Sequence, residues 1–440
     1  MIAAQRYREP MLLTTHLAIL LAPCAAAHAT STAGPANAFE VSSVEDEAPS
    51  AAERTAAIAR GVEFLLATQE DYVRDRGIGR LPDDELAAWQ KREQERLDGL
   101  QGGDEASEWP YEGVYRDGRQ RGAIPSGYRV GGTAIVCEAL LRSASEGTTR
   151  KEIEVAVNRS LEFILDRLEK DPTMAIGPKE GYDVRGWGHL HALQLMLLLR
   201  GEDFVAKARR KQLDGVAEDL IERLEANTTK QGGWNYASDK TVSPFMTGST
   251  LLVLFDAVEA GFEVDEDVIA GALDALQQCR TEEVSYAYSG RARREVAMPG
   301  SSARSSVAEL ALYKAGRSDV DELRRAVDGF FVGWDDLLVR KSQQGTHVGP
   351  YGIAPYYFFF GHTFAAHAIE ELPEKERAAR RDELAEVLWR TREENGSWND
   401  RIFPRTASYS TAMAMMALGA KDHGAFAEWD PAPSKKKRRR

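Results

Sequence analysis

The richest concentration of residues able to do chemistry is the stretch YDVRGWGHLH, at 182–191. It carries Asp183, Arg185, Trp187, His189 and His191. Asp183 lies near His189 in the sequence, which predicts a general acid–base pair. The alternative is that Asp183 caps the helix that follows it, or pairs with Arg185. Asp183 and His189 are therefore the candidate catalytic residues, and no catalytic mechanism is assigned to them.

Similar polar and aromatic residues recur just before or at the start of other apolar segments. They are Tyr128, Arg129, Tyr236, Arg304, Tyr356, His362 and Tyr409. If the connections that carry them meet on one concave surface, that surface is the default ligand site. We expect these seven residues, together with Arg185, Trp187 and His191, to bind a ligand there.

The histidine and cysteine spacings argue against a metal site. His189 and His191 are two residues apart, and on a helix they point about 200° away from each other. Cys137 and Cys279 belong to no C-x-x-C pair, and we expect two buried free thiols; the alternative is a single disulfide between them. No metal and no cofactor are predicted; the alternative is a zinc ion held by His189 and His362 from opposite sides of a cavity.

The residues above belong to a pattern that repeats six times along the chain. Each glycine-rich or aromatic connection leads into a strongly apolar helix, expected at 131–141, 186–199, 247–258, 301–313, 361–372 and 409–419. Amphipathic helices lie between them, expected at 53–68, 151–170, 207–226, 266–279, 320–340 and 376–392. In 151–170, for example, apolar residues recur at steps of three and four, which leaves a polar face.

A two-layer ring satisfies both helix types, with amphipathic helices outside and apolar helices inside. We therefore predict an all-α (α/α)6 toroid of six outer/inner pairs over residues 52–424. The first pair holds an inserted helix and loop, 70–127, expected to form a lid over one mouth of the ring. A helix that docks a partner is the competing interpretation of the insertion.

The connections also resemble a known repeat. Squalene-cyclase repeats read [K/R]-G-x-x-F-L-x-x-x-Q-x-x-x-G-x-W, and RGVEFLLATQ at 60–69 fits the first ten positions. The insertion would delay the tryptophan of that repeat to Trp109. KQGGW at 230–234 and ENGSW at 394–398 supply the Gly-x-Trp end, where Trp234 and Trp398 would clasp successive helix pairs. The chain thus resembles the squalene-cyclase and prenyltransferase repeat superfamily, a terpenoid-cyclase-like toroid.

The activity implied by that resemblance does not follow. The D-x-D-D motif of the cyclases is absent, and DDLLV at 335–339 lacks the last Asp of the D-D-x-x-D motif. The first functional hypothesis is that the toroid binds a ligand at its mouth. This ligand is either an apolar, isoprenoid-like molecule or a polymer. The alternatives are a glycan hydrolase or lyase, for which Asp183 and Asp400 are the only candidate carboxylate pair, and a non-catalytic interaction module.

The ends of the chain predict its destination. Residues 1–29 have the layout of a signal peptide, with cleavage near Ala29 and export to the periplasm or the extracellular space. Residues 30–51 are expected to be a disordered leader. With 69 acidic and 56 basic residues the net charge is −13, so no nucleic-acid partner is expected. The exception is the basic end of the tail, 425–440, which is expected to be disordered and to contact anionic surfaces.

Overall fold

The computed structural model describes residues 48–71, 107–112, 124–144, 147–177, 184–236, 238–292, 296, 298–341, 351–352, 357–401 and 403–430. All of them belong to one compact unit that spans Asp46–Arg440. The shape described below is that of this unit.

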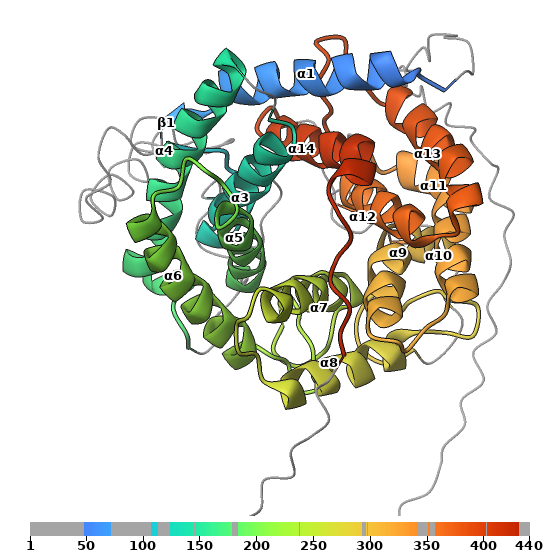
Figure 1. The fold of residues 1–440 in the computed structure, drawn as a ribbon. Helices are drawn as coiled ribbons and strands as arrows, with labels where there is room; N and C mark the ends of the chain where they lie inside the picture. The colour runs from blue at the N-terminus through green and yellow to red at the C-terminus, as the bar shows by residue number, and fades with distance from the viewer. Residues whose placement is uncertain are drawn as a thin grey trace, which may run out of the picture. The chain divides into compact units, whose positions relative to one another are not determined.

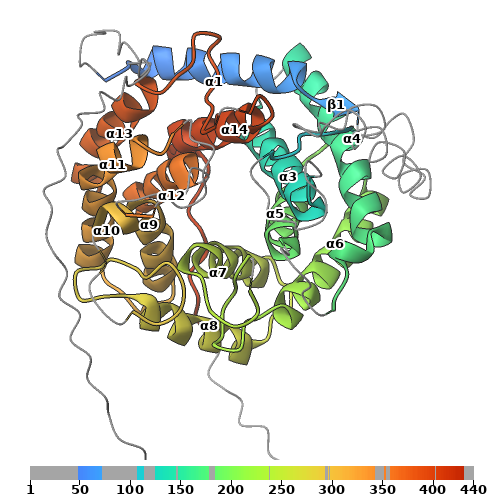
Figure 2. The ribbon, with the colours of Figure 1, turned by 180° about the vertical axis from the view of Figure 1, so that it is seen from behind.

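The described helices form two concentric rings (Figures 1 and 2). The inner ring is α3 (Ser126–Arg142), α5 (Arg185–Leu199), α7 (Pro244–Glu259), α9 (Met298–Lys314), α12 (Tyr357–Glu371) and α14 (Thr406–Gly419). Each inner helix packs against the next, and α14 packs against α3, which closes the ring. The outer ring is α1 (Ala51–Ala67), α4 (Thr148–Lys170), α6 (Lys207–Ala226), α8 (Glu266–Cys279), α10 (Val320–Val332) and α13 (Glu374–Trp389). The predicted (α/α)6 toroid is confirmed.

The two helix types are buried as their patterns predict. In α4 the five apolar residues that recur at helical spacing, Ile153, Val157, Leu161, Ile164 and Leu168, are all buried. The inner helices are buried on nearly all sides: in α7 thirteen of the sixteen residues are buried. The inner helices begin one to five residues before the expected positions, so Tyr128, Arg129, Arg185, Trp187 and Tyr409 lie on first helical turns.

One outer helix is broken where a single helix was expected at 320–340. Gly333 ends α10, and a short helix, α11 (Trp334–Leu338), follows. A Cβ atom at Gly333 would lie 2.7 Å from Ser302 Cβ, so only glycine allows α9 to come this close. The break lets the outer layer turn inward over α9.

Three tryptophans make the same pair of hydrogen bonds at the turns between outer and inner helices. Trp234 Nε1 donates to Leu224 O at the end of α6 (2.7 Å), and its backbone N–H donates to Thr247 Oγ1 on α7 (2.9 Å). Trp398 repeats this with Leu388 O and Thr411 Oγ1 (2.9 and 3.0 Å). The clasp role predicted for these tryptophans is confirmed.

Trp109 is the third member, although an insertion separates it from its outer helix. Its Nε1 donates to Leu65 O on α1 (2.8 Å) and its backbone N–H donates to Thr133 Oγ1 on α3 (3.0 Å). The tryptophan of the first repeat is therefore Trp109, as predicted. The two ends of the insertion pair as short antiparallel strands, β1 (Glu70–Asp71) and β2 (Ser107–Glu108), so the chain leaves the ring and returns at one place. The expected lid itself, 72–106 and 113–123, lies outside the described residues.

The C-terminal boundary was predicted too early. After α14 the chain forms a 3₁₀ turn, Ala420–Asp422, and residues 423–430 then cross the ring at the C-terminal ends of the inner helices (Figure 1). We call residues 420–430 the strap. The rings of Phe426 and Phe364 stack with centroids 6.4 Å apart, and those of Trp429 and Phe255 with centroids 5.8 Å apart. Residues 425–430 were expected to be disordered; these aromatic contacts are the physical reason that they are ordered.

Hydrogen bonds fix the strap to three inner helices. Arg142, the last residue of α3, donates to His423 O (2.9 Å). Ala427 N–H donates to Asp256 Oδ1 in the last turn of α7 (2.9 Å), and Trp429 N–H donates to Lys314 O at the end of α9 (2.8 Å). The strap therefore crosses one end of the ring (Figure 1). We use the word lumen for the centre of the ring, toward which the inner helices face.

Two further expectations concern the cysteines and the two ends of the chain. Cys137 and Cys279 are free and buried, as predicted. The signal peptide, almost all of the leader and the basic tail beyond Asp430 lie outside the described residues. Of the helices in the described ranges, none combines the length and the apolar character needed to cross a membrane.

Candidate functional site

The end of the ring opposite the strap carries a set of aromatic side chains on the inner helices. Tyr128 is the third residue of α3, Trp187 the third of α5, Phe245 the second of α7 and Tyr409 the fourth of α14. The rings of Tyr128 and Trp187 lie 5.3 Å apart at their centroids, and those of Trp187 and Tyr409 lie 6.1 Å apart. The first turns of four inner helices thus present one connected aromatic surface.

Two loop residues complete this surface. Tyr111, just after β2, lies with its ring centroid 4.5 Å from that of Tyr409, and Tyr236, in the loop before α7, lies 6.2 Å from Phe245. Together the aromatic pocket is lined by Tyr111, Tyr128, Trp187, Tyr236, Phe245 and Tyr409. The cavity that remains among the side chains is about 10 Å³, room for about one water molecule.

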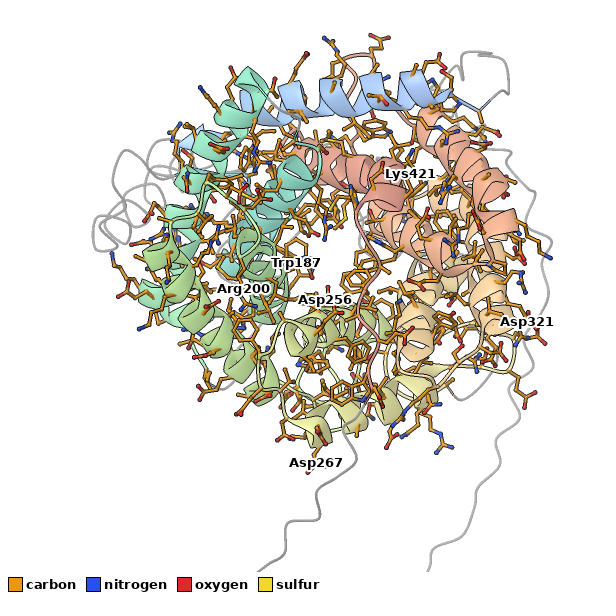
Figure 3. All side chains as sticks on the ribbon, in the orientation of Figure 1. Trp187, Arg200, Asp256, Asp267, Asp321 and Lys421 are labelled. Carbon is orange, nitrogen blue, oxygen red and sulfur yellow. The ribbon has the colours of Figure 1, made fainter. Side chains whose placement is uncertain are left out.

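Glycines at the start of α3 and α5 allow the pocket to form. A Cβ atom at Gly131 would lie 2.4 Å from Trp187 Cε3, so the indole ring lies directly on the backbone of α3. A Cβ atom at Gly188 would lie 3.0 Å from the Cα of Gly127. The two helices therefore approach each other closely, which turns Trp187 toward the middle of the ring (Figure 3).

A buried carboxyl group lies behind one wall of the pocket. Asp400 is fully buried, and Tyr111 Oη donates to its Oδ2 (3.2 Å). Arg401 Nε donates to the same Tyr111 hydroxyl (3.2 Å). Desolvation raises the pKa of Asp400 to about 6, against the opposing effect of the Arg401 charge. Asp400 does not line the pocket itself. It contacts the pocket wall through its hydrogen bond with Tyr111.

His191 lies one helical turn beyond Trp187. The two ring centroids are 4.8 Å apart, and the imidazole is buried. Burial lowers the pKa of His191 to about 3, so the side chain is neutral at physiological pH. It is the one candidate histidine that lies beside the aromatic pocket.

Of the ten predicted ligand-binding residues, the structure brings together Tyr128, Trp187, Tyr236 and Tyr409 as pocket lining, with His191 next to them. Tyr356 and the candidate catalytic residue Asp183 lie outside the described residues. The other predicted residues are placed elsewhere, and each is held by contacts of its own.

The three arginines make structural contacts instead of lining the pocket. Arg129 Nε donates to the buried carboxylate of Glu108 (2.7 Å) on the side of α3 that faces the outer layer. Arg304 donates to Tyr286 O (2.7 Å) and holds the loop before α9. Arg185 donates to Ala175 O and ties down the turn after η1 (Pro172–Met174). Arg129 and Arg185 are one and two residues from pocket residues in the sequence, yet they do not line the pocket.

The histidine pair expected as an alternative zinc site is not formed. His189 Nε2 donates to Met174 O (2.8 Å). His362 accepts from Trp334 Nε1 and lies 2.8 Å from Phe358 O through its Nδ1, so both its nitrogens are used within the α11–α12 contact. Within the described part of the chain, no group of three or more His, Cys, Asp or Glu residues is placed to hold a metal ion.

Tyr111 and Phe245 line the pocket but were not among the predicted residues. Phe245 could have been predicted, because an aromatic residue also occupies one of the first four positions of α3, α5 and α14. Tyr111 could not have been predicted, because it lies on a loop whose path depends on the insertion. Of the two missed residues, only Phe245 could therefore have been found from its position at the start of an inner helix.

Comparison with known proteins gives similarity in fold only. No family model matches the chain, and no curated protein matches it at a significant level. One similar solved structure is a possible GH105 family member from Klebsiella pneumoniae (12% identity, 89% of this chain and 99% of that chain, TM-score 0.42). A second is the GH76A alpha-1,6-mannanase from Salegentibacter sp. HEL1_6 (12% identity, 84% of this chain and 99% of that chain, TM-score 0.46). A third is a type II terpene cyclase from Scytonema in complex with geranylgeranyl dihydroxybenzoate (14% identity, 84% of this chain and 98% of that chain, TM-score 0.42). Similarity at this level indicates no activity for this chain.

Proposed function

We propose that this protein binds an apolar, isoprenoid-like ligand at the aromatic pocket. The observation that carries the proposal is the convergence of six aromatic side chains from four inner helices and two loops. Aromatic rings supply large apolar contact areas, and the polar side-chain groups of this lining are limited to the tyrosine hydroxyls and the indole N–H of Trp187. Such a surface suits a ligand that is itself mostly hydrocarbon.

The lining does not favour glycan cleavage. Glycoside hydrolases use two carboxyl groups about 5–9.5 Å apart across the scissile bond. Asp400, one of the two candidates, is separated from the pocket by Tyr111, with which it is hydrogen-bonded. The other candidate, Asp183, lies outside the described residues. No specific observation therefore supports the glycan hypothesis over apolar binding.

A ligand larger than a water molecule needs one lining ring to move. Tyr236 is the residue suited to this, because it lies on a loop and is half-buried, while the other five are buried. Its hydroxyl contacts that of Tyr288, and water can replace this contact. We propose that Tyr236 rotates outward when the ligand enters.

The wider proposal keeps the sequence-based expectations. The squalene-cyclase and prenyltransferase repeat superfamily is supported by the three tryptophan clasps, which occur at the matching repeat positions. Export after cleavage near Ala29 and contact of the basic tail with anionic surfaces remain proposals from the sequence. The strap supports a tail that leaves the ring at the end opposite the pocket, about 25 Å away along a 17-residue helix.

The test is binding of farnesene, a C15 isoprenoid hydrocarbon, measured by displacement of a fluorescent polyene probe. We expect saturable binding to the wild type and at least a tenfold loss in Trp187→Leu. Phe245→Leu gives a second variant in the same wall, and Trp389→Leu, on outer helix α13, is the control that should bind as the wild type does. Thermal melting checks that each variant is folded. Absence of saturable farnesene binding to the wild type would refute the proposal, and extraction of the purified protein for lipids would identify a natural ligand.

A further inference from the structure

The inner face of α5 continues from the aromatic pocket toward the strap. Successive helical residues are rotated by about 100°, so His191 and Gln194 lie about 40° and 20° to either side of Trp187 on the helix. Because Trp187 lines the pocket, these two side chains lie on the same lumen-facing side, one and two turns farther in. They are one turn apart, a spacing at which helical side chains meet.

Each of these side chains carries a buried polar atom without a hydrogen-bond partner among the described residues. The atoms are His191 Nε2 and Gln194 Oε1, and the two residues are 8% and 6% exposed. Leaving a buried donor or acceptor unpaired is destabilising, and such groups are uncommon in native proteins. Two of them one turn apart point to a missing partner that serves both.

The corresponding faces of neighbouring inner helices are largely apolar. Counting four and seven residues from the pocket aromatics gives Met413 and Met416 on α14 and Leu252 on α7, all of them buried. Ser249, also on α7, uses its hydroxyl to donate to Phe245 O (3.0 Å). His191 and Gln194 are thus polar where the corresponding positions of α14, and the second of those on α7, are apolar.

We propose that His191 and Gln194 form a subsite that binds a hydroxyl group at the inner end of the ligand. This inference rests on the proposed function, and it specifies the ligand class: an isoprenoid alcohol rather than a pure hydrocarbon. A hydroxyl group donates one hydrogen bond to Gln194 Oε1 and accepts one from the Nε2–H tautomer of His191. The imidazole is suited to this because burial keeps it neutral, with a pKa of about 3.

A matched pair of probes separates the hydroxyl from the chain. Farnesol and farnesyl methyl ether have the same C15 chain, but the ether has no hydrogen to donate, so Gln194 Oε1 would stay unpaired. Sites built to pair a substrate hydroxyl discriminate strongly against analogues that lack it. We expect the wild type to bind farnesol at least tenfold more tightly than the ether.

The variant Gln194→Met keeps the length of the side chain and removes the acceptor. We expect it to bind the two probes within twofold of each other and to bind the ether as the wild type does. His191→Phe is the second variant: it removes the donor to the probe oxygen, so we expect it to weaken the binding of both probes and to keep the preference for farnesol. The control is Gln212→Met on the outer face of α6, where Gln212 is exposed, and it should keep the full preference for farnesol.

The outcomes separate the inference from the proposed function. Equal affinities of the wild type for farnesol and the ether, with farnesene also bound, would overturn the subsite and show that the two atoms hold only a buried water. A preference for farnesol that survives Gln194→Met, or unchanged affinity for both probes in His191→Phe, would overturn it as well. Failure of all three probes to bind would refute the proposed function itself.

Discussion

The tryptophan clasp shows at the level of single residues how the repeats hold the ring together. Trp234 joins the end of α6 to the start of α7 through one side-chain and one backbone hydrogen bond, and it is 1% exposed. The preceding Gly232 and Gly233 have φ of +87° and +64°, which non-glycine residues rarely adopt. These glycines bring the indole back over the helix ends.

We predict that Trp234→Phe lowers the free energy of unfolding by about 1–3 kcal/mol. The smaller ring leaves part of the site empty, and the hydrogen bond from Trp234 Nε1 to Leu224 O is lost, although this oxygen keeps its bond from Asn227 N–H. Urea denaturation measures the change. Trp389→Phe, in which the tryptophan is half-buried on α13, is the control and should change stability by less than about 0.5 kcal/mol. Equal losses in the two variants would contradict a specific role for the clasp.

Tyr236 gives a second prediction for a single residue, which depends on the proposed function. Tyr236→Ala removes the ring that must rotate before a ligand enters, so farnesene should associate at least fivefold faster than with the wild type. Stopped-flow fluorescence measures the association rate. Tyr288→Phe removes only the hydroxyl contact and should give a smaller increase. An unchanged rate in Tyr236→Ala would show that ligands enter by another route.

Helical phase explains which site residues could be predicted from the sequence. Tyr128 and Arg129 are adjacent and chemically suited to a ligand, yet about 100° of rotation directs one to the pocket and the other to Glu108 in the outer layer. The sequence predicts that a helix starts near them, but not which face of its first turn is turned inward. That depends on contacts between helices far apart in the chain, such as Gly131 against Trp187.

At the level of elements, most of the fold could be predicted from the sequence repeat. Alternation of apolar and amphipathic helices predicted the two layers, and the spacing of the motif predicted Trp109 as the displaced first tryptophan. The break of the 320–340 helix at Gly333 could not be predicted, because it results from the close approach of α9. The strap could not be predicted either, since its few aromatic residues have no periodic pattern.

The strap gives a prediction at this scale. Trp429→Ala removes the stacking contact with Phe255 and loosens the residues that donate to Lys314 O and Asp256. We expect the amides of Ala427 and Trp429 to exchange with deuterium at least tenfold faster, while farnesene affinity at the other end of the ring stays the same. Hydrogen exchange with mass spectrometry measures the first, and probe displacement the second. Unchanged exchange at both amides would contradict an anchoring role for Trp429.

For the whole ring, the burial of titratable groups dominates the dependence of stability on pH. Desolvation lowers the pKa of His191 and His367 to about 3 and that of His362 and His423 to about 4. Desolvation acts in the opposite sense on acids, and it raises the pKa of Asp256 and Asp400 to about 6. The histidines lie along the lumen, in the α11–α12 contact and under the strap, so the effect belongs to the ring as a unit.

The sign of the pH dependence follows from where each group takes up its proton. As pH falls below about 6.5, the unfolded chain protonates these histidines while the folded ring does not, so folding loses stability. The two aspartates oppose this, because between about pH 4 and 6 the folded state binds their protons and the unfolded state does not. The four histidines outnumber the two aspartates. Near pH 5.5, unfolding should therefore take up about two protons net, and the free energy of unfolding should rise by roughly 3 kcal/mol per pH unit.

Urea denaturation at pH 5.0, 5.5, 6.0 and 6.5 measures this slope. Asp256→Asn is the informative variant, because the amide oxygen still accepts from Ala427 N–H while one of the two opposing protons is removed. Its slope should be steeper than that of the wild type by about 1 kcal/mol per pH unit. A wild-type stability that stays constant or falls as pH rises through this range would show that the buried histidines are protonated in the folded ring. That would place water inside the lumen, where the helices now enclose neutral imidazoles.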